Sequence, residues 1–121
     1  MDEVIRVNDL RKVYMIGGEK VVALDCINMN IPKGQICCIL GTSGSGKSTL
    51  LNMLAGLERP SRGKIMLGTH DIAKMDERDL AFFRQKHIGF VFQSYNLING
   101  FDAVYNVAMP LMFRGEDKKI R

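Results

Sequence analysis

The first third of the chain alternates apolar and polar residues in short stretches separated by turn residues, a pattern typical of β-strands. Three strands are expected there, at Val4–Val7, Tyr14–Ile16 and Val21–Leu24. Asn8-Asp9 breaks the first strand, and Gly17-Gly18 joins the other two as a hairpin or a loose loop. Residues 27–31 alternate again before Pro32-Lys33-Gly34 forms a turn. We therefore expect residues 1–34 to form a half-buried antiparallel β layer.

Two later runs are apolar throughout, which is typical of strands covered on both faces. These runs are Ile36–Leu40 and Ile88–Phe92. Between them, Lys64–Leu67 predicts a short strand that ends at Gly68. The fully apolar runs predict part of a parallel core sheet in addition to the antiparallel layer.

Apolar residues at helical spacing predict three helices. The first runs from Lys47, and its core face is expected to hold Leu50, Leu51, Leu54 and Leu57. Asp76 can cap a second helix that continues through Phe83. The third is amphipathic, with its apolar face at Val104, Val107, Ala108, Leu111 and Met112. Pro110 would kink this last helix or mark its end.

Composition narrows the classes of protein to which the chain can belong. Its 121 residues allow one domain at most, and the net charge of +4 comes without a run of about five or six like charges, so we expect no nucleic-acid partner. Cys37 and Cys38 lie inside an apolar run and are expected to act as small hydrophobes in a reducing compartment, with zinc binding as a weak alternative. No signal peptide is visible, and no apolar run approaches the ~20 residues needed to span a bilayer.

Residues 41–49 read Gly-Thr-Ser-Gly-Ser-Gly-Lys-Ser-Thr and satisfy the phosphate-binding pattern G-x-x-x-x-G-K-[ST]. An apolar run precedes this loop and a helix-prone run follows it, which is the strand–loop–helix context that the motif requires. The sequence therefore predicts a loop that binds a nucleoside triphosphate with Mg²⁺. The alternative is a flexible loop of glycine and serine between a strand and a helix.

Each residue type in this loop suits a phosphate ligand. Gly44 and Gly46 allow left-handed backbone angles, which turn N–H groups inward into a nest for phosphate oxygens. Lys47 supplies a mobile positive charge for the β- and γ-phosphates, and the helix N-terminus adds N–H donors. Ser48 offers a hydroxyl to Mg²⁺. The residues expected to contact the nucleotide are Gly41, Thr42, Ser43, Gly44, Ser45, Gly46, Lys47, Ser48 and Thr49.

Further segments accompany the loop in a fixed order. They are Ala23-Leu24-Asp25, Pro32-Lys33-Gly34-Gln35, Pro60-Ser61-Arg62-Gly63, Ile88–Gln93, Tyr95-Asn96-Leu97 and Tyr105-Asn106-Val107. With these segments the chain, from about Val4 to Arg121, resembles the first half of an ATP-binding-cassette (ABC) transporter ATPase. It looks like the group that serves lipoprotein-release, macrolide-export and antimicrobial-peptide-export permeases. Several spaced matches in register are more specific than the phosphate loop alone.

The resemblance implies roles for three further residues. Tyr14 falls where the family places an aromatic ring that stacks on adenine, although a plain strand aromatic is the alternative. Gln93 matches the glutamine that reaches Mg²⁺ and the attacking water, in a loop that also connects to the membrane partner; a surface loop residue is the alternative. Thr49 is similar to the residue that touches the α-phosphate, or is simply a hydroxyl at a helix start. The catalytic candidates are therefore Lys47 and Gln93, and the metal ligands Ser48 and Gln93.

The resemblance also implies an α/β fold of the P-loop NTPase type. It assigns an antiparallel β layer to residues 1–34, part of the P-loop core to 35–93, and the glutamine loop and start of a helical subdomain to 94–121. The implied activity is ATP hydrolysis coupled to a separate membrane permease, with two ATP-binding domains forming a homodimer. We expect a cytoplasmic protein, peripheral on the inner face of the cell membrane, whose membrane contact is made only through the permease.

Three family features needed for hydrolysis are not found in the sequence: a Ser-Gly-Gly signature, an apolar strand ending in Asp-Glu, and a switch histidine. We therefore expect an incomplete ABC ATP-binding domain that binds ATP weakly and does not turn it over. One alternative is an ABC-type fragment with a non-transport role in cell-envelope regulation, or an inert nucleotide-binding module. Another phosphate-loop enzyme is disfavoured, because a GTPase needs an Asn-Lys-x-Asp stretch and a kinase does not explain Tyr14 and Gln93 in register.

Overall fold

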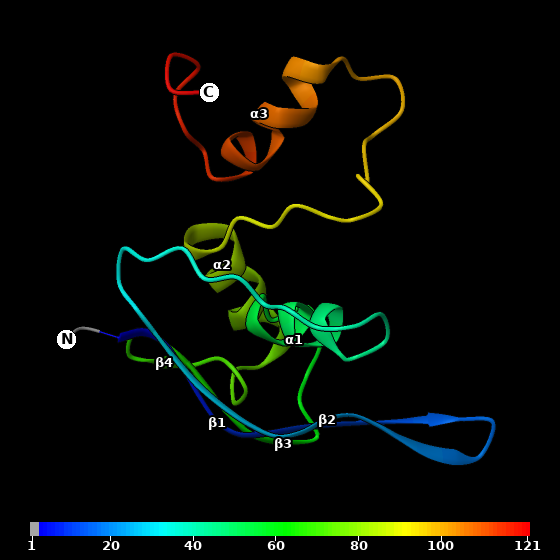
Figure 1. Ribbon diagram of the computed structural model, residues 1–121. Coiled ribbons are helices and arrows are strands. Elements are labelled where there is room, and N and C mark those ends of the chain that lie inside the picture. The colour runs from blue at the N-terminus through cyan, green and yellow to red at the C-terminus, as the bar shows by residue number, and fades with distance from the viewer. Residues whose placement is uncertain (1–2) are drawn as a thin grey trace. The chain divides into compact units, whose positions relative to one another are not determined.

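The structure is a computed structural model that describes residues 3–121 (Figure 1). It contains two compact units, one ending at Leu80 and one running from Ala81 to Arg121. The elements of the first unit are β1 (Glu3–Ile16), β2 (Glu19–Pro32), α1 (Lys47–Leu54), β3 (Arg62–Leu67) and β4 (His70–Asp71). Helix α2 (Glu77–His87) spans the junction, and α3 (Ala103–Phe113) belongs to the second unit.

The first unit is built on a four-stranded sheet in the order β2-β1-β3-β4, in which every neighbouring pair is antiparallel. The hairpin at Gly17-Gly18 and the antiparallel layer are thus confirmed. The predicted break at Asn8-Asp9 is wrong, because β1 continues to Ile16 with a register shift between Val7 and Leu10. Asp9 has a φ of 49° there, so a β-bulge absorbs the polar pair and both neighbouring strands stay paired.

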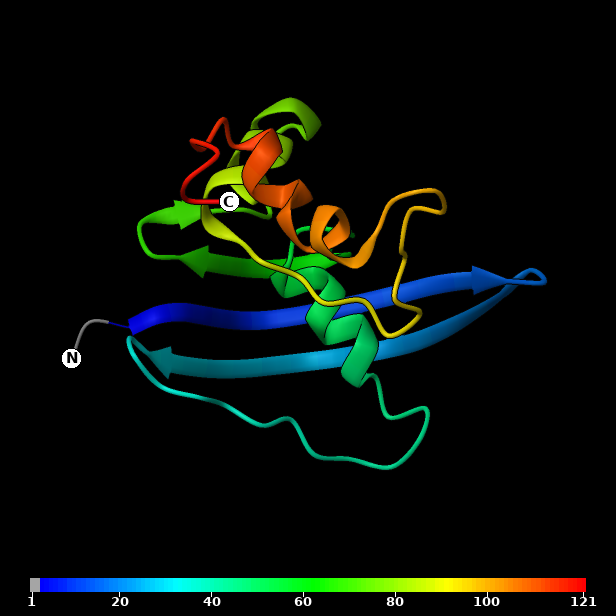
Figure 2. The same ribbon diagram turned by 90° about the horizontal axis from the view of Figure 1, so that it is seen from above.

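The core of the first unit lies between this sheet and α1. Figure 2 shows α1 lying across β1 and β2, with the far end of the hairpin extending beyond the helix. The side chains buried there include Val7, Leu10, Leu24, Leu50, Met53 and Ile65. The predicted helix face was partly wrong: Met53 is fully buried, whereas Leu51 and Leu57 are exposed. Since α1 ends at Leu54, Leu57 lies beyond the helical repeat on which that prediction depended.

The two runs predicted to be doubly covered strands form no strand. Ile36 and Leu40 are 98% and 91% exposed, and Val91 is 96% exposed. A parallel strand needs a hydrogen-bonded neighbour, and within residues 3–121 the only sheet is the antiparallel one already described. Cys37 and Cys38 are consequently exposed free thiols rather than buried hydrophobes. Burial of both apolar runs would be favourable, but the described residues do not provide it.

Helices α2 and α3 follow their predicted starts more closely than their predicted ends. The Asp76 carboxylate accepts from the N–H of Asp79 at 2.8 Å, which confirms the cap, although α2 continues to His87. Helix α3 runs past Pro110 to Phe113, so the alternative that this proline ends the helix is wrong. The predicted apolar face of α3 is not a core face, because no residue of this fully described helix is buried. Among residues 3–121, no helix is both long and apolar enough to cross a membrane.

Candidate functional site

The glycine-rich loop Gly41–Thr49 leads from an unpaired segment into α1. Its backbone turns back where the N–H of Ser45 donates to the carbonyl of Thr42 at 3.2 Å. Gly46 has a φ of 95°, and a Cβ at this position would lie 2.6 Å from the backbone oxygen of Ala23. Only glycine allows both this backbone angle and this approach. The loop is therefore held against β2 at the start of the helix.

Lys47 folds back over the loop that precedes it. Its ammonium donates to the carbonyl oxygens of Gly41 and Thr42 at 2.9 and 2.6 Å, and to the hydroxyl of Ser45 at 3.3 Å. An ammonium has three donors and carries a full positive charge. These contacts fix both the curvature of the loop and the place of that charge within it.

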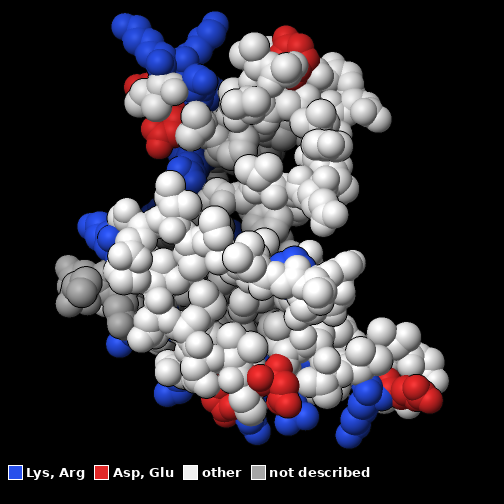
Figure 3. All heavy atoms as spheres, in the orientation of Figure 1, with Lys and Arg blue, Asp and Glu red and all other residues white. Residues whose placement is uncertain are grey.

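The start of α1 adds donors beside this charge. The first hydrogen bond within the helix runs from the N–H of Leu50 to the carbonyl of Gly46 at 2.9 Å. The preceding N–H groups, at residues 46–49, have no partner along the helix, and no side chain caps them. The first turn carries no acidic residue, and Figure 3 shows a largely uncharged surface around α1 in that view, with charges gathered along the sheet below. Uncapped N–H groups at a helix start favour an anion.

The other loop side chains differ in exposure. The hydroxyls of Thr42, Ser43 and Ser48 belong to exposed residues, and Thr49 is half-buried. Ser48 is thus placed to offer an oxygen ligand from the first turn of α1, as a magnesium site requires. Its role as a metal ligand remains a prediction.

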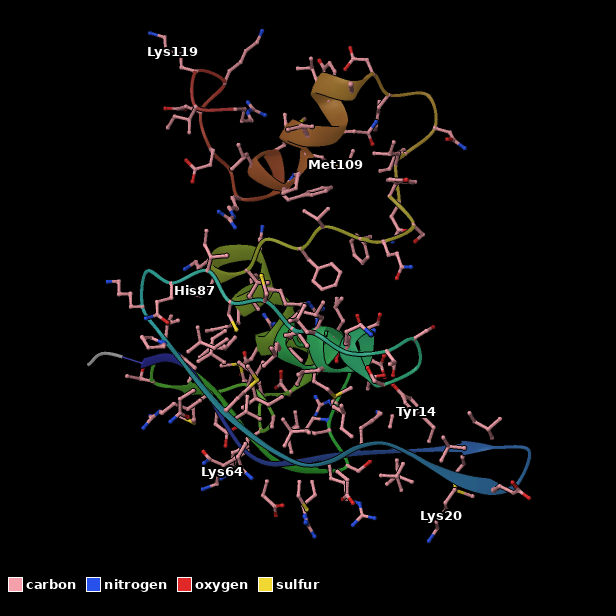
Figure 4. The ribbon with its side chains drawn as sticks, in the orientation of Figure 1. Tyr14, Lys20, Lys64, His87, Met109 and Lys119 are labelled. Atoms are coloured by element: carbon pink, nitrogen blue, oxygen red, sulfur yellow. The ribbon has the colours of Figure 1, made fainter. Side chains whose placement is uncertain are left out.

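Tyr14 lies on β1 on the side of the sheet that carries α1, whereas Lys20 and Lys64 point to the other side (Figure 4). Its hydroxyl donates to the Glu58 carboxylate at 2.6 Å. Burial, followed by this carboxylate, raises the pKa of Tyr14, and side-chain hydrogen bonding with Thr49 acts in the opposite direction. Thr49 lies in the first turn of α1, so Tyr14 and the glycine-rich loop belong to one neighbourhood of the first unit. The adenine-stacking role of Tyr14 remains a prediction.

Gln93 lies in the second unit, on a turn closed by the N–H of Tyr95 donating to the carbonyl of Phe92 at 3.2 Å. Its side chain is exposed, and the next residues are strained: Tyr95 and Asn96 have φ values of 64° and 48°. Beside this turn is a groove of about 630 Å³. Apolar residues dominate its lining, among them Phe90, Phe92, Tyr95, Leu97, Pro110 and Phe113. The catalytic and metal-binding roles of Gln93 remain predictions.

Sequence reasoning missed the residues that surround Tyr14. Glu58 accepts its hydroxyl, Lys12 lies over its ring at 5.0 Å from the centroid, and Asn52 donates to Glu58 at 3.0 Å. Tyr14 and Glu58 are 44 positions apart, and no motif spacing links them. The only sequence signal was the period-2 placement of Lys12 and Tyr14 on one face of a strand.

The ABC transporter family matches residues 24–120 of the chain. The chain is 41% identical, over 115 residues, to the lipoprotein-releasing system ATP-binding protein LolD of Chromohalobacter salexigens, covering 95% of this chain and 48% of that protein. It is 38% identical, over 114 residues, to the macrolide export ATP-binding/permease protein MacB of Vibrio parahaemolyticus, and the match covers 94% of this chain and 17% of MacB. Its structure matches that of dimeric MJ0796, a bacterial ABC transporter cassette, with a TM-score of 0.87 at 39% identity over 91% of this chain and 47% of the cassette. The chain thus spans about half the length of LolD and the cassette, and less of MacB.

Proposed function

Because the chain belongs to the ABC transporter family, we propose that it is the nucleotide-gripping part of a transporter's ATP-binding subunit, which holds ATP and Mg²⁺ in the loop Gly41–Thr49. One observation carries the proposal: the Lys47 ammonium sits within a glycine-rich loop, next to the uncapped start of α1. A fixed cation beside several free N–H donors suits a polyphosphate. A related structure of the same cassette, MJ0796, was solved bound to ADP and Pi.

Each part of the nucleotide has a proposed contact. Lys47 and the N–H groups of residues 44–49 take the phosphates, with Thr49 nearest the α-phosphate. Ser48 and Gln93 ligate Mg²⁺ through oxygen atoms. The ring of Tyr14 stacks on adenine. The half-buried setting of Tyr14 and its link with Thr49 support its place beside the loop.

Hydrolysis of ATP by the full protein is part of this proposal, with Lys47 stabilising charge on the γ-phosphate and Gln93 orienting the attacking water. An ammonium and an amide cannot act as a general base at neutral pH. We therefore expect these 121 residues alone to bind ATP without turning it over. Robust ATPase activity of the chain by itself, abolished in Lys47→Ala, would contradict this part of the proposal.

The proposed partners are a membrane permease and a second ATP-binding domain. MacB joins ATP-binding and permease functions under one name, and the matched cassette was solved as a dimer, which supports both. The apolar groove beside Gln93 is the surface of the second unit that suits a permease segment. The chain would then work at the cytoplasmic face of a membrane, attached through the permease.

Isothermal titration calorimetry with ATP and Mg²⁺ tests the nucleotide site. The wild-type chain should bind, and Lys47→Ala should weaken binding about 10- to 100-fold, because a hydrogen bond to a charged group contributes about 1.5–3 kcal/mol. Lys20→Ala is the matched control, since it removes an exposed lysine on the opposite side of the sheet. Equal weakening by the two substitutions would show that only net charge matters and would refute the assignment of the loop.

A further inference from the structure

The side chain of Glu58 is held by both of its carboxylate oxygens. One oxygen accepts from the hydroxyl of Tyr14 at 2.6 Å, and the other accepts from the side-chain amide of Asn52 at 3.0 Å. We propose that Glu58 is a positioning residue that fixes the ring of Tyr14 as the platform for the nucleobase, and so sets the base-dependent part of ATP affinity. This inference rests on the proposed function, and it concerns the recognition of the base rather than of the phosphates.

The support for Glu58 comes from the helix that carries the phosphate loop. Glu58 lies in the turn segment that follows the end of α1 at Leu54, and its N–H donates to the backbone oxygen of Asn52 at 3.4 Å while the Asn52 side chain holds its carboxylate. Asn52, near the end of α1, therefore supports Tyr14 through Glu58. Thr49, in the first turn of the same helix, opposes the burial-driven rise in the pKa of Tyr14 through side-chain hydrogen bonding.

Lys12 occupies the neighbourhood of the same ring. Its ammonium lies 5.0 Å from the ring centroid of Tyr14 and is anchored by the carbonyl of Arg59 at 2.7 Å and by Glu58 at 3.6 Å. A cation over one face of an aromatic ring is attracted to its π-electrons. One face of Tyr14 is thus occupied by a fixed residue of this chain, so a base that stacks on this ring must use the other face.

The charges in this cluster favour a rigid arrangement. The Tyr14 hydrogen bond, followed by those of Asn52 and Lys12, lowers the pKa of Glu58, whereas burial and Glu58 raise the pKa of Tyr14. At neutral pH the pair is therefore an ionised carboxylate accepting from a neutral phenol. Hydrogen bonds of this charge-assisted kind are short and strong, as the 2.6 Å distance indicates. Without Glu58, the Tyr14 ring would keep its surface for stacking but would lose the hydrogen bond that fixes its orientation.

The test compares two ligands that share phosphates and differ in the base: ATP and inorganic tripolyphosphate, each with Mg²⁺, titrated calorimetrically into the 121-residue chain. Glu58→Ala and Tyr14→Phe should each lower ATP affinity about 3- to 10-fold and leave tripolyphosphate affinity unchanged, since each removes the hydrogen bond between Tyr14 and Glu58. The double variant should be no worse than either single one, because both changes break the same bond. Glu19→Ala, at an exposed glutamate of β2, is the matched control and should change neither affinity.

The outcomes separate this inference from the proposed function. If Glu58→Ala weakens both ligands equally, or leaves ATP binding unchanged, or if the two single effects multiply in the double variant, the positioning role is wrong while the phosphate site stands. If the wild-type chain binds tripolyphosphate as tightly as ATP, the base platform does not exist. If it binds neither ligand, the proposed function fails, and this inference fails with it.

Discussion

The substitution Gly46→Ala tests how the phosphate loop is joined to the fold. Gly46 has a φ of 95°, and an added Cβ would lie 2.6 Å from the backbone oxygen of Ala23 and 3.1 Å from a methyl carbon of Leu24. A left-handed backbone costs a residue with a Cβ about 1–2 kcal/mol, and overpacking against a fixed backbone costs about 1–3 kcal/mol. We therefore expect the free energy of unfolding to fall by about 2–5 kcal/mol.

Gly44→Ala provides the matched comparison within the same loop. Gly44 has a φ of 76°, but a Cβ there meets no atom within 4 Å, so only the backbone cost of about 1–2 kcal/mol applies. Urea unfolding followed by far-ultraviolet circular dichroism measures both variants, since the chain has no tryptophan. Equal losses of stability in the two variants would refute the claim that contact with β2, rather than backbone strain alone, fixes the loop.

Two further predictions concern single side chains. The pKa of Glu58 is lowered, so its contribution to stability is present above the ordinary glutamate pKa and is lost as the pH falls through the lowered value. The difference in unfolding free energy between wild type and Glu58→Gln should therefore shrink as the pH falls from about 7 to about 3. A constant difference would contradict that linkage. In the second unit, the Asn106 side chain accepts from the N–H of Ile98 at 2.8 Å and donates to the carbonyls of Phe101 and Asp102 at 3.1 and 3.0 Å. Asn106→Ala should destabilise this loop by about 1–3 kcal/mol, seen as faster hydrogen exchange of the Ile98 amide, and unchanged exchange would show that the contact is not important.

Local patterning was enough to predict the antiparallel layer. The hairpin at Gly17-Gly18 depends on neighbouring residues only, and so does the Asp76 cap of α2. The bulge at Asp9 could not be foreseen, because it depends on β1 keeping partners on both sides, β2 and β3, the second of which comes more than 40 residues later. Tertiary pairing overrode the local preference of Asn8-Asp9 for a turn.

The apolar runs show where sequence patterning reaches its limit. Ile36–Leu40 and Ile88–Phe92 have the composition of buried strands, yet neither run joins a sheet among residues 3–121. A run of hydrophobic residues indicates that its burial would be favourable, but the run does not supply the surface that would cover it. The fold class is nevertheless confirmed, since the chain matches an ABC cassette with a TM-score of 0.87.

The candidate site likewise contains residues that the sequence predicts and residues that it does not. The glycines, Lys47 and Ser48 are contiguous in sequence, so a motif with fixed spacing predicts them. Glu58 contacts Tyr14 from 44 positions away, and no spacing rule encodes that contact, whereas Lys12 lies on the same strand as Tyr14.

Amide spectra of the ¹⁵N-labelled chain, titrated with ATP and Mg²⁺, test the central claim most directly. The account predicts saturable shifts that are largest at the N–H groups of residues 44–49, with a smaller response at Tyr14 and Glu58, and their loss in Lys47→Ala. Shifts that appear only outside these residues, or that persist in Lys47→Ala, would contradict the assignment of this loop as the nucleotide site.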